Sequence, residues 1–132
     1  MRSEVLSVYY LKLNNMEQTL IQRKSFAFAI RIVNLYRFLT EEMHEYVLSK
    51  QLLRSGTSIG ANVREAKRAQ TEADFGMKMS ISLKEAEESM YWIELMKETG
   101  YLTEEQFLSI YGDCEELVKM LVSTTKKVYR KE

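Results

Sequence analysis

The sequence predicts an all-α protein, an up-down-up-down antiparallel four-helix bundle with a short N-terminal extension. Its 132 residues include no proline, so no residue type that breaks long helices is present. Four stretches repeat apolar residues at three- and four-residue intervals, the spacing of one helix face. The connections between them are short and polar, which favours antiparallel neighbours. We assign residues 1–15 to the extension and residues 16–132 to a single bundle domain.

The extension differs in composition from the rest of the chain. Residues 5–13, VLSVYYLKL, are rich in aromatic and β-branched residues and favour a strand. Asn14 and Asn15 then favour a turn. Because the capped, periodic helices all begin later, we expect the bundle to fold without residues 1–15.

The first helix is predicted from about Leu20 to Thr40. It has a second apolar line on another side, formed by Phe26, Ile30 and Val33. A helix that is apolar on more than one side is either central or buried in an oligomer. Its core-facing stripe is Phe28, Ala29, Ile32, Leu35, Tyr36 and Leu39.

The second helix is predicted from about Tyr46 to Gln70, after a polar connection at Thr40–Tyr46. Gly56 and Gly60 each cost about 1 kcal/mol against alanine inside a helix, so we interpret them as sites of close helix–helix approach. The small and polar residues of this stretch, with acidic and aromatic residues of the next helix, form a predicted helix-packing and oligomer motif. Its members are Ser55, Gly56, Ile59, Gly60, Asn62, Glu65, Glu85, Glu88 and Trp92.

The last two helices carry the clearest end signals. Thr71 and Asp74 are spaced as a capping box that begins the third helix, and Gly100 is placed to end it. Thr103 and Gln106 form a second capping box that begins the fourth helix. The third helix turns Phe75, Met79, Leu83, Ala86, Met90 and Ile93 to the core, and the fourth has a stripe from Phe107 to Val128. One bundle core cannot bury two sides of three helices, so we predict a homo-oligomer.

A line of basic residues is the one feature that suggests a ligand. Lys50, Arg54, Arg64 and Arg68 share one face of the second helix, with Thr57 and Ala61 between them. Arginine and lysine supply most contacts to nucleic-acid phosphates, so the four are candidate RNA- or DNA-binding residues. The alternative is an ordinary solvated face. Pairing of these cations with Glu65, Glu85 or Glu88 would favour a structural or protein-interaction module instead.

Other functions find little support in the residues. The chain carries 19 basic and 19 acidic residues, so bulk charge does not drive nucleic-acid binding. His44 is the only histidine and lies in a connection, and no glycine-rich phosphate loop follows a strand, so we predict no enzyme, metal, cofactor or small-molecule substrate. Cys114 lies on an apolar stripe, where core packing is favoured over a nucleophile, and a single cysteine suits the cytoplasm. No apolar run is long enough to span a membrane.

Two segments carry a family resemblance. RSGTSIGANVREA and DFGMKMSISLKEAEESMYWIEL resemble four-helix-bundle proteins encoded by intervening sequences of bacterial 23S rRNA genes. The resemblance covers about Lys24 to Val128. It implies a homopentameric ring and a relationship to the accessory variability determinant of diversity-generating retroelements, a basic ring that binds nucleic acid. This chain differs from that relative in having no net charge.

Two functional hypotheses follow. The first is an oligomeric scaffold that associates with RNA or DNA. The second is a structural or protein–protein interaction module that binds no nucleic acid. Both describe a protein that is not an enzyme.

Overall fold

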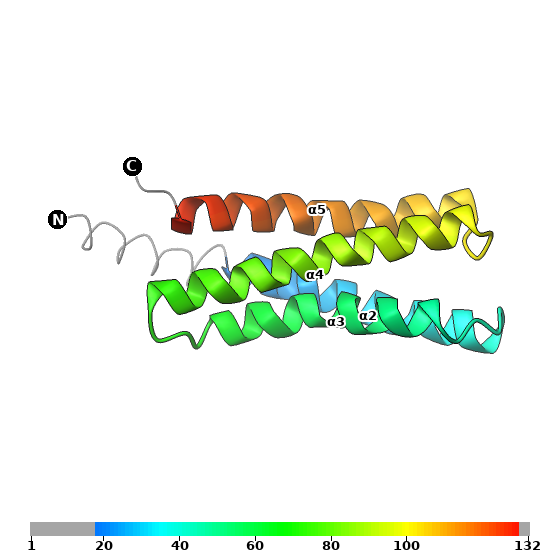
Figure 1. Cartoon of the computed structure of the whole chain (residues 1–132), viewed down its shortest axis with the longest axis horizontal. Helices are drawn as coiled ribbons and strands as arrows, with labels where there is room; N and C mark the ends of the chain where they lie inside the picture. Colours follow the sequence, from blue (N-terminus) through cyan, green and yellow to red (C-terminus); the bar gives the residue numbers. More distant parts are fainter. Residues whose placement is uncertain (1–17, 130–132) are drawn as a thin grey trace.

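The computed structural model describes residues 18–129 and contains four α-helices within them. They are α2 (Gln18–Glu41), α3 (Leu48–Ala66), α4 (Glu72–Glu98) and α5 (Glu104–Tyr129). The helices run up and down in sequence order and form an elongated rod (Figure 1), which confirms the predicted four-helix bundle. The extension predicted at residues 1–15 lies outside the described residues.

Both predicted capping boxes begin helices. The Thr71 hydroxyl accepts a hydrogen bond from the Asp74 backbone N–H at 3.0 Å, at the start of α4. At the start of α5 the bonds are reciprocal. The Thr103 hydroxyl accepts from the Gln106 N–H at 3.1 Å, and the Gln106 side chain accepts from the Thr103 N–H at 2.9 Å. Gly100 has φ 89°, which is a left-handed conformation. It terminates helix α4, as the sequence predicted.

The second helix is shorter at both ends than the predicted range. It begins at Leu48 because the carboxylate of Glu45 accepts the free N–H groups of Val47, Leu48 and Ser49 at 3.0, 2.8 and 2.6 Å. Burial alone would raise the pKa of Glu45, but these backbone donors outweigh burial and leave the pKa below its usual value. Beyond Ala66 the α-helix ends in a tighter turn, in which backbone N–H groups donate to carbonyl oxygens three residues earlier.

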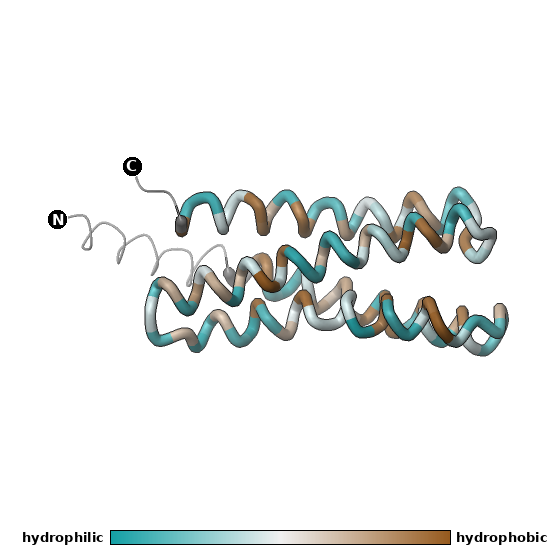
Figure 2. The backbone as a smooth tube through the Cα atoms, viewed as in Figure 1, coloured by the Kyte–Doolittle hydropathy of each residue, from teal (hydrophilic) through white to brown (hydrophobic). Residues whose placement is uncertain are grey.

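The core runs the length of the rod. Hydrophobic residues recur along every helix (Figure 2), and the fully buried large side chains come from all four. They include Phe28 and Ile32 of α2, Leu52 and Ile59 of α3, Phe75 and Ile93 of α4, and Leu117 of α5. The core stripes predicted for the first, third and fourth helices supply Phe28, Ile32, Phe75, Ile93 and Leu117, although Ala29, Leu35 and Tyr36 of α2 are only half-buried.

The two predicted glycine sites bring α3 close to α2. A Cβ atom at Gly56 would lie 2.8 Å from Cγ1 of Ile32, and one at Gly60 would lie 3.3 Å from the backbone oxygen of Ser25. The close approach therefore lies between two helices of the same chain.

The four helices do not contact one another equally. Each packs extensively on the helix next to it in sequence, whereas α2 and α5 contact each other sparsely. Two ion pairs cross this last seam, Arg31–Asp113 at 2.6 Å and Lys24–Glu116 at 3.0 Å. Two surface grooves of about 470 and 340 Å³ also lie along it.

Candidate functional site

The predicted basic line lies mostly on the outer face of α3. Lys50, Arg54 and Arg64 are exposed on the helix, and Arg68 is exposed in the turn just after it. Thr57 and Ala61 lie between them, as the spacing predicted. The hydroxyl of Thr57 donates to the backbone oxygen of Leu53 at 2.7 Å, so it is already satisfied inside the helix.

Arg54 differs from the other three because it is held by α4. Its guanidinium pairs with Glu85 at 3.2 Å and with Glu88. Glu88 also accepts a hydrogen bond from the indole N–H of Trp92 at 2.9 Å. Arg54 therefore links α3 to α4. This pairing is one that would favour the interaction-module hypothesis for this residue.

Glu65, the third predicted acidic partner, bonds elsewhere. Its carboxylate pairs with Lys78 of α4 at 2.8 Å. The same contact raises the pKa of Lys78, mainly through the hydrogen bond to Glu65. Arg64 is thus left without a carboxylate partner among the described residues.

Of the other residues of the predicted packing motif, Ser55 and Ile59 make hydrogen bonds across the α3–α4 seam, whereas Gly56 and Gly60 face α2. Ser55 and Ser89 are fully buried, and their hydroxyls are hydrogen-bonded at 2.8 Å. Buried Ser82 donates to the backbone oxygen of Ile59 at 2.9 Å. The amide of Asn62 donates to the backbone oxygen of Ser58 at 2.9 Å. These polar groups are satisfied within one chain, which lets two helices approach closely without leaving a buried donor unpaired.

A groove lies between α2 and α3 beside the basic line. It has a volume of about 370 Å³ and is lined by Gln22, Phe26, Ala29, Thr57, Gly60, Ala61, Arg64 and Glu65. We call it the Phe26 groove. The Phe26 ring is 54% exposed, and the guanidinium carbon of Arg64 lies 5.5 Å from its centroid. An arginine at this distance over a ring makes a cation–π contact.

The zero net charge conceals a strong segregation of charge. Residues 18–70, which form α2 and α3, contain nine Lys and Arg against four Asp and Glu. Residues 71–129, which form α4 and α5, contain six Lys and Arg against twelve Asp and Glu. Because α2 packs on α3 and α4 on α5, one side of the rod is basic and the opposite side is acidic. The sequence analysis missed this feature, which a charge count for each helix pair would have found.

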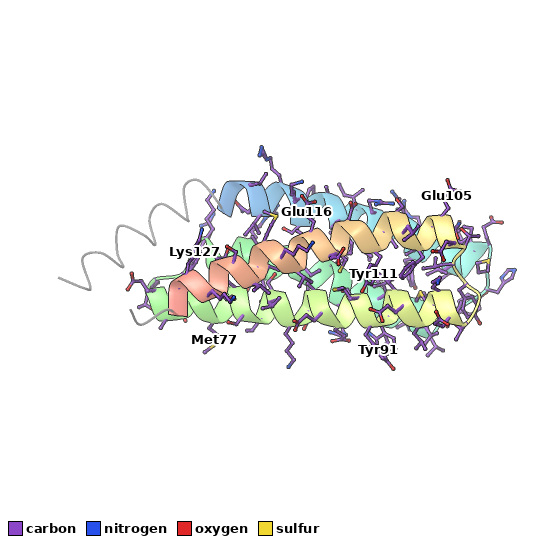
Figure 3. The ribbon with its side chains drawn as sticks, turned by 90° about the horizontal axis from the view of Figure 1, so that it is seen from above. Met77, Tyr91, Glu105, Tyr111, Glu116 and Lys127 are labelled. Atoms are coloured by element: carbon purple, nitrogen blue, oxygen red, sulfur yellow. The ribbon has the colours of Figure 1, made fainter. Side chains whose placement is uncertain are left out.

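Large apolar side chains are exposed together on α2 and on α4, besides Leu108 of α5 and Tyr46 and Val47 before α3. Phe26 and Ile30 of α2 are 54% and 49% exposed, and Met77 and Tyr91 of α4 are both 58% exposed. Met77 and Tyr91 lie along the outer edge of α4 (Figure 3). Since α2 and α4 are diagonal partners in the bundle, these two patches point in different directions.

The described residues offer little to a chemical mechanism. No group of three or more His, Cys, Asp or Glu in residues 18–129 could hold a metal ion. Cys114 is fully buried, and burial raises the pKa of its thiol to about 12, with the charge of Asp113 adding to the effect. A hydrogen bond to Glu94 raises the pKa of Tyr111 to about 12. None of the four helices has the length and apolar character needed to cross a membrane.

Comparison with known proteins assigns most of the chain. The model of the family described as 23S rRNA-intervening sequence protein matches residues 17–123. A crystal structure of a protein with unknown function from the S23 ribosomal protein family of Bacteroides thetaiotaomicron is similar at 55% sequence identity. The match covers 84% of this chain and 99% of that chain, with a TM-score of 0.83. No functionally curated protein matches.

Proposed function

The chain belongs to the 23S rRNA-intervening sequence protein family, and from this membership and its segregated charge we propose that it is a non-enzymatic scaffold whose α2–α3 surface binds the phosphate backbone of RNA or DNA. The observation that carries the proposal is the excess of basic residues on α2 and α3. A polyanion that approaches α2 and α3 therefore meets a surface on which positive charges outnumber negative ones.

Screening makes the local charge more important than the total. At physiological ionic strength charges interact over about 8 Å, less than the roughly 10 Å diameter of a single helix. The acidic side of α4 and α5 is therefore largely screened from a ligand on α2 and α3. Zero net charge does not exclude phosphate binding under these conditions.

Three residues of the basic line supply the contacts. Lys50, Arg64 and Arg68 are exposed, whereas Arg54 is committed to Glu85 and Glu88. A subunit that neutralises so few phosphates binds weakly at physiological salt, and its affinity falls steeply as salt is added.

The test compares two charge reversals of equal size, one on the basic line of α3 and the turn after it, and one on α4 and α5. Arg64→Glu/Arg68→Glu changes the basic side, and Lys84→Glu/Lys119→Glu changes exposed lysines of α4 and α5. We expect a low-salt mobility-shift titration with RNA and DNA to show weaker binding only for the first variant. Equal retention by both variants, or no shift of the wild type at tens of micromolar, would contradict the proposal and favour an interaction module.

Self-association is a second proposal with its own observation. Exposed apolar side chains lie on α2 and on diagonal α4, within the basic and acidic sides respectively. Unlike surfaces that complement each other form a heterologous contact, and such contacts close into rings when the rotation permits. The family resemblance implies a homopentamer. A ring would repeat the basic line and raise avidity without any new contact.

Light scattering at micromolar concentration tests this second proposal. We expect a mass that is a multiple of the 15.5 kDa chain. Ile30→Asp and Met77→Asp should each reduce that mass, because each places a charge in one of the two apolar patches. A wild-type mass near 15.5 kDa would refute self-association.

A further inference from the structure

We propose that the Phe26 groove is a binding site for one unstacked nucleobase, so that the protein prefers single-stranded over double-stranded nucleic acid. This inference rests on the proposed phosphate-binding function and names the form of nucleic acid that fits the same surface. Four features of the groove support it: an exposed aromatic ring, a close cation, an amide with no partner among the described residues, and a small volume beside Gly60.

The aromatic ring provides the stacking surface. Phe26 is 54% exposed although it is a large apolar residue, and one edge of the groove is formed by it. Proteins that bind single strands stack successive bases on such rings, and every base has a face that can stack. In a duplex these faces are covered by neighbouring base pairs, so stacking requires a base that is free or splayed out.

The cation of the groove, Arg64, is also a member of the basic line. Arg64 lies over the Phe26 ring at 5.5 Å and belongs to the candidate phosphate-binding set. Arg23 is also exposed on α2, one turn before Phe26 in the sequence. A base in the groove would therefore have Arg64 beside it for a flanking phosphate, with Arg23 exposed on the same helix as Phe26.

The floor and the free polar group set the size and chemistry of the occupant. Gly60 has no side chain, and a Cβ there would lie 3.2 Å from Oγ of Ser25, so α2 and α3 are in close contact beside the groove and close it at this point. Its volume of about 370 Å³ is at the small end of ligand sites, which suits one base and not a long ligand. The Gln22 side chain makes no hydrogen bond among the described residues, and an amide can both donate to and accept from a base edge.

The test measures binding of a short mixed-sequence oligonucleotide, as a single strand and as a blunt duplex, by fluorescence anisotropy at low salt. Phe26→Ala removes the stacking surface, and Phe26→Tyr keeps it. Leu108→Ala is the control, since Leu108 of α5 is 59% exposed but neither lines the groove nor belongs to the α2 and α4 apolar patches. We expect Phe26→Ala to weaken single-strand binding about fivefold or more and to leave duplex binding unchanged. Phe26→Tyr and Leu108→Ala should retain single-strand binding within about twofold.

Several outcomes would overturn the inference. Equal affinity of the wild type for the two forms, or unchanged single-strand affinity of Phe26→Ala, would remove the base site while leaving phosphate binding intact. A changed oligomeric mass for Phe26→Ala, with the mass of Phe26→Tyr unchanged, would assign the ring to a subunit contact instead. No binding of either form by the wild type would remove the proposed function together with the base site.

Discussion

Alanine at Gly56 should destabilise the protein, although the same change stabilises most helices. Removing a glycine from a helix interior normally gains about 1 kcal/mol. Here the added Cβ would lie 2.8 Å from Cγ1 and 3.0 Å from Cγ2 of Ile32. Ile32 is 1% exposed and β-branched, so its side chain has little freedom to move away. Overpacking of this kind costs about 1–3 kcal/mol, and we expect a net loss of up to about 2 kcal/mol.

The chain offers a matched control for this prediction. Gly112 lies in α5, is exposed, and has no neighbour within 4 Å of an added Cβ. Gly112→Ala should therefore gain about 1 kcal/mol from helix propensity alone. Urea denaturation followed by circular dichroism measures both changes, and an unchanged m-value would show that each variant exposes the same amount of surface on unfolding.

A third variant tests whether Ile32 causes the loss. Ile32→Ala removes the three carbon atoms closest to the added Cβ, so Gly56→Ala should cost less in that background than in the wild type. The difference is the coupling energy of the two sites, which we expect to be about 1 kcal/mol or more. If Gly56→Ala stabilises the protein as much as Gly112→Ala does, the close approach of α2 and α3 at this position is wrong.

Three further predictions concern packing and titration. Gly60→Leu should cost about 1–3 kcal/mol, because its Cβ alone would lie 3.3 Å from the backbone oxygen of Ser25; an unchanged denaturation midpoint would show that the site has room. The depressed pKa of Glu45 contributes stability that is complete above its ordinary value of 4.5 and is lost as the pH falls below it. Glu45→Gln should therefore flatten the unfolding free energy against pH in this acidic range, and an identical profile for the two proteins would exclude the cap. Cys114, with a pKa of about 12 and no exposure, should react with a thiol reagent at pH 8 only as fast as the bundle opens, so rapid labelling of the native protein would contradict its burial.

The fold was predictable because its signals are local. Helix spacing and the capping boxes at Thr71 and Thr103 depend on residues within one or two turns, so the sequence alone located three of the four helices closely. The start of the second helix was predicted too early because Glu45 caps the helix from outside the periodic region. In the sequence, a glutamate in a polar connection cannot be distinguished from an exposed charged residue. Only the structure shows that its carboxylate accepts hydrogen bonds from backbone N–H groups.

The candidate site was less predictable because it depends on which helices meet. The sequence could name Glu65, Glu85 and Glu88 as partners for a basic line, but the register between α3 and α4 decides that Arg54 takes the last two and Lys78 takes the first. The Phe26 groove needs residues of α2 and α3 side by side, and Phe26 appeared in sequence only as part of a second apolar line. The charge segregation likewise has meaning only once the adjacent helices are known.

The sparse seam between α2 and α5 has a consequence for how quickly the chain folds. Nearly all helix contacts join neighbours in sequence, so few contacts need distant parts of the chain to meet. Proteins with such low contact order fold in microseconds to milliseconds. The α3–α4 hairpin, which has a neighbour on each side, is the natural nucleus, and α2 and α5 can add to it independently. Amide hydrogens of the two outer helices should therefore exchange sooner than those of α3 and α4.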